Sequence, residues 1–545
     1  MRRAAAGVAL AGLLGLAEVA SAKLVKTPNK LSIQGGTCKT TAVDSFFSIP
    51  YAKPPVGDLR YAAPEPYAPP SCGIVINATN PTPSCIQFGT AFEETGSQSE
   101  DCLYLNIWAP SSATPGSDLP VKVWLFGGGN EGGGVSDPTY DGCYTAQDSI
   151  LVSINYRLGP LGFLALTDLG LSGNYGTQDQ LLGLRWVQDN IQSFGGDPNK
   201  VLLFGESAGA TNTFVLATRP DAPKLMRAAA MESGGGRDIA TVAEAQTYQK
   251  IFFEQLNCST PDIACVRAAS PSLLQAAYAA VPGEPAPGVQ TPFSSNGSRS
   301  SWSPLVDGVV IAGQPSAAGL QVPSILGSNS QEGALFVLAS YGAGAAALTQ
   351  ADYDAFLAYN FGPLAARVND TFSVSDVFNG SVAAAMTVVV TDVSYKCSAH
   401  RGLLGAGGSS GKGKGVPVWT YRFAHEPDCA WYANIPAQYV SVLGATHSSE
   451  IPFVFNMTTN MPPPDGNCTF PAAGQKIAHT LSRAWTNMAE FGAPGPDEDA
   501  WPAWTSDNST GLVVNDAVEV GKVDYDSCAF WDEINTALNK YAAGQ

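Results

Sequence analysis

Ser207 lies at the centre of Gly-Glu-Ser-Ala-Gly, residues 205–209, which is a G-x-S-x-G pattern. The apolar residues 201–204 precede it, and the small residues 208–211 that follow can begin a helix. Glycines on both sides of the serine permit a sharp turn between strand and helix, and that turn would expose the hydroxyl at the end of a sheet. A serine held in this way can attack an acyl carbon. An N-capping serine in an ordinary turn would show the same pattern, so the assignment depends on further groups.

Acyl transfer by serine also needs a base, a group that orients the base, and N–H donors for the oxyanion. Three consecutive glycines directly follow the apolar run that ends at Phe126. No side chain blocks the N–H groups of such residues. We therefore expect the N–H groups of Gly128, Gly129 and Ala208 to form an oxyanion hole. An ordinary flexible turn is the alternative, since the chain has another triple glycine at 132–134.

Short apolar runs alternate with longer helical patterns, and these segments predict the strands and helices that position the serine and the triple glycine. Four short runs predict strands: 121–126, 150–156, 201–204 and 416–423. Several of them are continuously apolar, as expected of strands that are covered on both faces. Residues 177–194 predict a helix, because apolar residues recur every three or four positions and Gly195 follows. This alternation predicts an α/β fold with a mostly parallel central sheet.

The composition and the N-terminus indicate a single secreted domain. The chain has 545 residues, 45% of them hydrophobic and 14% charged, and contains no long polar linker. Its most biased stretch, 405–415, is flanked by apolar segments, so we expect a surface loop there. Residues 1–22 combine two arginines, an apolar stretch and a final Ala-Ser-Ala, which predicts a signal peptide and a mature domain of residues 23–545.

Charge and cysteine content narrow the choice of partners. The formal net charge of −18 disfavours binding to nucleic acid or to anionic membranes. No later segment is long and apolar enough to span a bilayer, and no lipidation signal ends the chain, so we expect no membrane anchor. Eleven cysteines favour disulfides and an extracellular location, and the odd number leaves at least one thiol free or in an intermolecular bond. Eight sequons are candidate N-glycan sites: Asn77, Asn257, Asn296, Asn369, Asn379, Asn456, Asn467 and Asn508.

Further short segments follow one another in an order that is itself informative. They are Ile-Pro-Tyr-Ala at 49–52, Pro-Pro-Val-Gly-Asp-Leu-Arg at 54–60, Ser-Glu-Asp-Cys-Leu-Tyr-Leu-Asn at 99–106, Asn-Tyr-Arg-Leu-Gly at 155–159, Gly-Phe-Leu at 162–164, Phe-Gly-Gly-Asp-Pro at 194–198, Val-Asp-Gly at 306–308, Asn-Ser-Gln-Glu-Gly at 329–333 and His-Ser-Ser-Glu-Ile-Pro-Phe at 447–453. With the serine motif they resemble the type-B carboxylesterase/lipase family, the cholinesterase-like branch of the α/β-hydrolases, and especially its secreted fungal members. The resemblance implies an α/β-hydrolase fold in one large domain.

The same resemblance implies the two missing catalytic partners. Glu332, directly before Gly333, matches the triad acid of the family, and His447 matches its base. The order serine, acid, histidine is that of α/β-hydrolases. All four histidines of the chain follow Glu332, so order alone does not choose among them, and it is the family pattern that selects His447. A triad of Ser207, Glu332 and His447 needs no metal ion and no organic cofactor.

The resemblance also implies two disulfides, Cys85–Cys102 and Cys258–Cys265. The loop between Cys85 and Cys102 is short and acidic, which makes it a poor lid for an oil surface. It also lacks the tryptophan with which cholinesterases bind choline, so choline specificity is not expected.

Three residues near the expected site are candidates for substrate binding. Asn130 brings an amide close to the oxyanion loop, where it could contact substrate or cap the turn. Leu335 stands where cholinesterases have an aromatic residue. Phe336 is a candidate for the acyl pocket, with ordinary core packing as the alternative.

The leading hypothesis is a secreted serine carboxylic-ester hydrolase that acts on small-molecule esters. A true lipase or sterol esterase acting on long-chain lipid esters is the first alternative, and amide or thioester hydrolysis would use the same groups. A catalytically silent binding protein of the same family is disfavoured, because Ser207, Glu332 and His447 are all present.

Overall fold

The computed structural model describes residues 23–69, 73–89, 93–94, 96–258, 262–281, 289, 302–406, 415–495 and 500–542. The predicted signal peptide, residues 1–22, lies outside the described residues. The predicted loop at 405–415 lies mostly outside them as well, and Gly405 belongs to a helix.

A mixed sheet of eleven strands forms the centre of the described part of the molecule. In spatial order its strands are β18 (Val518–Lys522), β17 (Thr510–Val514), β16 (Val418–Phe423), β15 (Ser324–Asn329), β14 (Ala228–Glu232), β13 (Gly196–Glu206), β9 (Leu119–Leu125), β10 (Ile150–Ile154), β8 (Tyr104–Pro110), β4 (Val43–Pro50) and β3 (Gly36–Thr37). The strands from β17 to β10 are parallel, and the pairs at both edges are antiparallel. The α/β fold with a mostly parallel sheet is confirmed.

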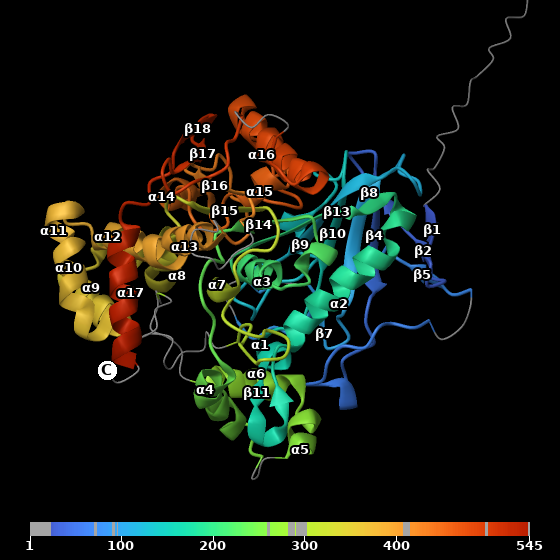
Figure 1. The fold of residues 1–545 in the computed structure, drawn as a ribbon, viewed down its shortest axis with the longest axis horizontal. Helices are drawn as coiled ribbons and strands as arrows, with labels where there is room; N and C mark the ends of the chain where they lie inside the picture. The colour runs from blue at the N-terminus through green and yellow to red at the C-terminus, as the bar shows by residue number, and fades with distance from the viewer. Residues whose placement is uncertain are drawn as a thin grey trace, which may run out of the picture.

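Smaller strands and many helices surround this sheet. The remaining strands are β1 (Leu24–Lys26), β2 (Ser32–Gln34), β5 (Val75–Asn77), β6 (Ser84–Cys85), β7 (Gln98–Ser99), β11 (Ala165–Leu166) and β12 (Leu171–Ser172). The helices are α1 (Gly159–Phe163), α2 (Tyr175–Asn190), α3 (Ala208–Ala217), α4 (Val242–Glu254), α5 (Ile263–Ala268), α6 (Pro271–Ala280), α7 (Pro315–Ala318), α8 (Gly333–Tyr341), α9 (Gln350–Phe361), α10 (Ala365–Thr371), α11 (Val374–Val377), α12 (Val382–Val390), α13 (Cys397–Ala406), α14 (Val440–Leu443), α15 (Ile451–Val454), α16 (Ala472–Phe491) and α17 (Cys528–Ala542). Figure 1 shows α9, α10 and α17 gathered at one end of the molecule and α4 to α6 at another.

The predicted elements occur where the sequence places them. The apolar runs 121–126, 150–156, 201–204 and 416–423 correspond to β9, β10, β13 and β16. The predicted helix 177–194 corresponds to α2 and a 3₁₀ turn, and it ends where Gly195 adopts a left-handed conformation with φ of 97°. Glycine reaches that conformation without steric cost, so it terminates the helix as the pattern indicated.

The core lies against the central strands and is rich in aromatic side chains. Trp124 of β9 is fully buried and contacts Phe204 of β13 at 4.8 Å and Phe455 at 5.1 Å between ring centroids. These contacts fix the carboxyl ends of β9 and β13 relative to each other. The two segments that carry the serine and the triple glycine therefore start from a rigid base.

The described chain contains five disulfides: Cys38–Cys143, Cys85–Cys102, Cys258–Cys265, Cys397–Cys528 and Cys429–Cys468. The second and third are the pairs that the resemblance implies. The eleventh cysteine, Cys72, lies outside the described residues. None of the helices in the described ranges combines the length and apolar composition that crossing a bilayer requires.

Candidate active site

Ser207 occupies a tight turn between β13 and α3. Its φ of 57° and ψ of −122° are strained for a residue with a side chain. Its backbone N–H donates to the carbonyl oxygen of Glu232 at 2.9 Å, which ties the turn to the end of the neighbouring strand β14. A Cβ on Gly205 or Gly209 would lie 2.6 Å or 2.0 Å from the carbonyl oxygen of Leu125. Only glycine fits at both positions, so this sequence forms the sharp strand-to-helix turn.

Glu332 lies at the end of the segment that follows β15, directly before α8. Its side chain is fully buried. One carboxylate oxygen accepts the backbone N–H of Asn329 at 2.7 Å, and the other lies 2.7 Å from Nδ1 of His447. Both oxygens are thus engaged, and the carboxylate can hold the imidazole in a single orientation.

His447 lies in the chain segment between α14 and α15, and its ring packs against two aromatic side chains that also stack on each other. The ring centroid is 4.7 Å from that of Tyr395 and 5.0 Å from that of Phe336. Within the described part of the chain, Nε2 has no hydrogen-bond partner, although it lies 3.1 Å from Oε1 of Glu206. The ring is therefore fixed on its Nδ1 side by Glu332.

The triple glycine turns at the end of β9, beside the serine. Gly128 and Gly129 have φ of 88° and 66°, which glycine adopts readily. A Cβ on Gly127 would lie 3.0 Å from Cβ of Ser207, so the turn passes close to the serine. No described residue accepts a hydrogen bond from the N–H of Gly128, Gly129 or Ala208. These three N–H groups remain available to an anionic ligand.

A cavity that opens to solvent brings several of these residues together. Its lining includes Gly127, Gly128, Ser207, Leu335 and His447. The rest of its described lining is mostly polar: Glu93, Gly133, Asp137, Tyr140, Glu206, Tyr432, Asn434, Ile435 and Ser448. Three of these side chains are carboxylic acids and none is lysine or arginine.

The three predicted substrate-binding residues have different surroundings. Leu335 lines the cavity, and its backbone N–H donates to the hydroxyl of Thr446 at 2.8 Å. Asn130 is not among the described lining residues, because its side chain is buried and its Oδ1 accepts Nδ2–H of Asn212 at 2.8 Å. Phe336 is half-buried, packs on the ring of His447 and is not among the described lining residues. Of the three, Leu335 is the one among the described lining residues of this cavity.

Several buried glutamates surround the histidine, and the sequence pattern did not single them out. The pKa of Glu206 is raised well above its ordinary value. Burial is the largest cause, and repulsion from the carboxylates of Glu450, Glu332 and Glu232 adds to it. Burial, and then the carboxylate of Glu332, raise the pKa of Glu450 to about 8. Burial likewise raises the pKa of Glu232, whose Oε1 accepts the indole N–H of Trp485 at 2.7 Å. Glu206 is the variable residue before the serine, so its acidity was the available signal.

The family relationship is clear from comparison with known proteins. The sequence profile of the carboxylesterase family matches residues 21–531. The chain is 31% identical to para-nitrobenzyl esterase of Bacillus subtilis over 509 residues. This match covers 90% of this chain and 95% of that protein. It is 32% identical to fumonisin B1 esterase of Sphingopyxis macrogoltabida, over 88% of this chain and 84% of that protein. It is also 32% identical to cocaine esterase of Homo sapiens, over 85% of this chain and 81% of that protein.

The matched residues run through the sheet, the serine turn and the segments that carry Glu332 and His447. The fold is the α/β-hydrolase fold in a single domain, as the resemblance implied. The chain therefore belongs to the type-B carboxylesterase family and is a carboxylic-ester hydrolase.

Proposed function

We propose that the protein is a secreted serine carboxylesterase that acts through Ser207, Glu332 and His447. The observation that carries the proposal is the 2.7 Å hydrogen bond between Glu332 and His447 at a cavity that Ser207 also lines. The strained turn at Ser207 supports the same assignment, because backbone strain of this kind is characteristic of functional sites.

In the proposed first step, Ser207 Oγ attacks the ester carbonyl carbon while Nε2 of His447 accepts its proton. Glu332 keeps the other ring nitrogen, Nδ1, protonated and stabilises the imidazolium that forms. The carbonyl oxygen becomes an oxyanion, which the N–H groups of Gly128, Gly129 and Ala208 bind. Each such donor contributes on the order of 3 kcal/mol to stabilising the transition state.

The tetrahedral intermediate then collapses to an acyl-enzyme. The bond between the carbonyl carbon and the alcohol oxygen breaks, and the imidazolium of His447 returns the proton to the leaving alcohol. A water molecule repeats the sequence with His447 as its base, which releases the acid and restores the Ser207 hydroxyl. These steps balance without any metal ion or organic cofactor.

The cavity favours short or polar esters over long-chain lipids. Its described lining is dominated by carboxylic acids, phenols and an amide, with Leu335 and Ile435 as the aliphatic side chains. A long acyl chain would gain little by leaving a lipid phase for such a wall. We therefore expect a carboxylesterase of soluble esters, with a lipase or sterol esterase as the alternative.

Secretion is part of the same proposal. The signal-like residues 1–22 support it, and so do the five disulfides, which persist in oxidising compartments. The same location would allow N-glycosylation. Among the sequon asparagines that the structure describes, five are exposed: Asn77, Asn257, Asn379, Asn467 and Asn508.

The decisive test is hydrolysis of p-nitrophenyl esters from acetate to palmitate by the wild type, Ser207→Ala and Ser112→Ala. We expect Ser207→Ala to lower kcat by roughly 10⁶-fold, because the alcohol nucleophile is lost. Ser112 is exposed and distant in sequence from the serine turn, so Ser112→Ala should match the wild type. Turnover retained in Ser207→Ala would refute the triad.

The chain-length profile separates the remaining alternatives. A maximum at short acyl chains is the expected result. A maximum at long chains, rising above the solubility limit of the substrate, would identify a lipase or sterol esterase instead. Wild-type protein that cleaves none of the esters would contradict the proposed activity.

A further inference from the structure

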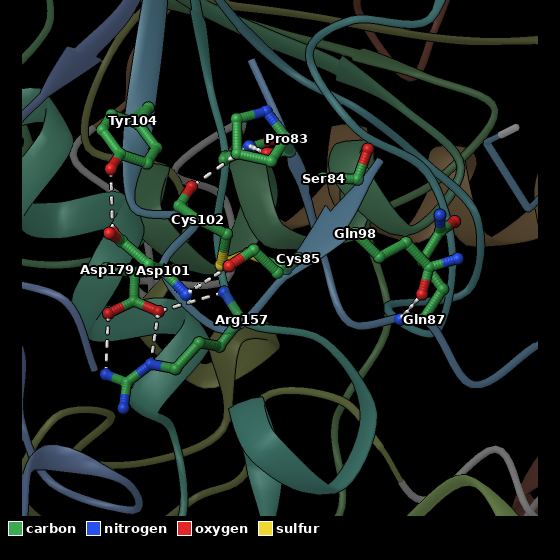
Figure 2. The surroundings of a disulfide bond; sticks show 12 residues. Pro83, Ser84, Cys85, Gln87, Gln98, Asp101, Cys102, Tyr104, Arg157 and Asp179 are labelled. Carbon is green, nitrogen blue, oxygen red and sulfur yellow. Dashed lines mark hydrogen bonds and ion pairs between the residues drawn. A yellow bond between two sulfur atoms is a disulfide. The ribbon is translucent and has the colours of Figure 1, made fainter. Parts of the chain in front are cut away.

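The loop closed by the disulfide Cys85–Cys102 is hydrogen-bonded to the glycine turn, residues 127–134. The backbone N–H of Phe88 donates to the carbonyl oxygen of Glu131 at 2.7 Å. The backbone N–H of Gly133 donates to Oε1 of Gln87, also at 2.7 Å. Two segments about forty residues apart in sequence are therefore joined directly beside the proposed oxyanion hole. Figure 2 shows Gln87 next to this disulfide, with its backbone N–H bonded to Gln98.

Gln87 is built into this junction. Its side chain is buried, with 2% of its surface exposed. Oε1 accepts a second hydrogen bond, from the backbone N–H of Glu94 at 2.9 Å, and Nε2 donates to the carbonyl oxygen of Glu94 at 3.1 Å. One amide group thus holds the acidic loop on one side and the glycine turn on the other. A buried amide with these partners is costly to displace.

The geometry of the turn carries this restraint to the oxyanion donors. Gly132, the residue before Gly133, donates its N–H to the carbonyl oxygen of Gly128 at 3.0 Å, and Glu131 donates to the same oxygen at 3.0 Å. The carbonyl of Gly128 and the N–H of Gly129 belong to one planar peptide unit. Fixing the direction of that carbonyl therefore fixes the direction of the Gly129 N–H.

We propose that Gln87 is a positioning residue that holds the glycine turn so that the N–H of Gly129 points at the developing oxyanion. The inference rests on the proposed function, since it assigns Gly129 to the oxyanion hole. Gln87 touches neither substrate nor nucleophile, and it acts through Gly133. Its loss should impair stabilisation of the transition state more than binding of the substrate.

The test compares three variants on p-nitrophenyl butyrate. Gln87→Met keeps the length of the side chain but removes the acceptor, and we expect kcat to fall about 10- to 100-fold with KM changed less than about threefold. The fall is partial because the bond from Phe88 to Glu131 remains. Gln87→Glu retains an acceptor oxygen and should recover most of kcat.

Gln275→Met is the matched control. Gln275 of α6 donates to the backbone carbonyl oxygen of Gln87 at 2.8 Å, contacts the same residue, and is not among the described residues of the cavity wall. Its variant should keep kcat within about twofold of the wild type. Equal losses in Gln87→Met and Gln275→Met would show that only general packing around residue 87 matters, and unchanged kcat in Gln87→Met would overturn the inference directly.

Amide hydrogen exchange provides a readout that does not depend on turnover. Peptides covering residues 127–134 should exchange faster in Gln87→Met than in the wild type or Gln275→Met, because Gly133 loses its acceptor. Unchanged exchange would refute the structural half of the inference. If the wild type hydrolyses no ester, the proposed function and the catalytic half fail together, while the exchange data still decide whether Gln87 holds the turn.

Discussion

Buried glutamates differ in how well their oxygens are satisfied. Glu332 and Glu450 have both carboxylate oxygens hydrogen-bonded. One oxygen of Glu206 and one of Glu232 have no partner among the described residues. A buried carboxylate is most costly when it is ionised and lacks donors. Burial therefore raises the pKa of Glu206 and of Glu232, and their protonated forms are favoured in the folded protein.

Glu450 offers the clearest test of this electrostatic cost. Its pKa is about 8 in the folded protein and near 4.5 when unfolded, so the unfolded chain loses its proton first as pH rises. Protonated Glu450 therefore contributes fully to the free energy of unfolding below about pH 4.5. This contribution falls as the pH rises to about 8, by up to about 1.4 kcal/mol per pH unit. Glu450→Gln should flatten that decline in urea unfolding measured from pH 5 to 9.

The control for Glu450→Gln is Glu519→Gln on β18, where the side chain is exposed. That variant should leave the pH dependence of the unfolding free energy unchanged. A Glu450→Gln protein with the same slope as the wild type would contradict the assigned pKa.

At the residue scale, the sequence predicts the polar groups that lie in recognisable patterns and misses the others. Ser207, Glu332 and His447 each stand in a short pattern, and the last two are hydrogen-bonded in the structure. Glu206 and Tyr395 also contact the imidazole, but the sequence marks Glu206 only by its acidity beside the serine and does not mark Tyr395 at all. Their role depends on long-range packing, which local patterns do not encode.

Among the elements, the turn from β13 into α3 is packed tightly against its neighbours. Gly209, in the first turn of α3, lies against the end of β9, where a Cβ would meet the carbonyl oxygens of Leu125 and Phe126 at 2.0 Å and 2.7 Å. Both obstacles are backbone atoms of a central strand, so neither can rotate away. α3 can approach β9 this closely only because residue 209 is a glycine and has no Cβ.

Gly209→Ala should therefore destabilise the protein by about 3 kcal/mol or more. Gly313→Ala is the matched control, because a Cβ at Gly313 has open space within 4 Å, and it should be nearly neutral. Urea unfolding of the two variants measures the difference. Equal midpoints would mean that α3 can shift away from β9 without cost.

Element positions follow from the sequence better than element lengths do. The apolar run 201–204 identifies the centre of β13, but the strand spans Gly196–Glu206. Its first part pairs with Leu119 across an irregularity between Gly196 and Val201. Polar residues can extend a strand in this way when a neighbouring strand supplies hydrogen bonds, and hydrophobicity carries no sign of it.

Over the whole molecule, the exposed carboxylate of Glu93 at the cavity has the same sign as the total charge of −18. Both should repel anionic esters, and the long-range part should weaken as salt screens it. We expect p-nitrophenyl hydrogen succinate to be hydrolysed with at least about tenfold lower kcat/KM than p-nitrophenyl butyrate at low ionic strength.

Salt titration is the measurement that tests this repulsion. The difference in kcat/KM between the anionic succinate ester and the neutral butyrate ester should narrow as ionic strength rises. The kcat/KM for the butyrate ester should stay nearly constant. Glu93→Gln should narrow this difference in kcat/KM further, because Glu93 is the exposed carboxylate at the cavity. A gap that does not respond to salt would attribute the discrimination to shape.

The disulfide between Cys397 and Cys528 has a consequence for how the protein survives proteolysis. It spans 131 positions, so a single cut anywhere between them leaves both fragments covalently joined. His447 lies inside the spanned segment, and Ser207 and Glu332 precede it. A nicked chain would thus keep its histidine tethered to the fragment that carries the nucleophile, and the cut would become visible in electrophoresis only after a reductant is added.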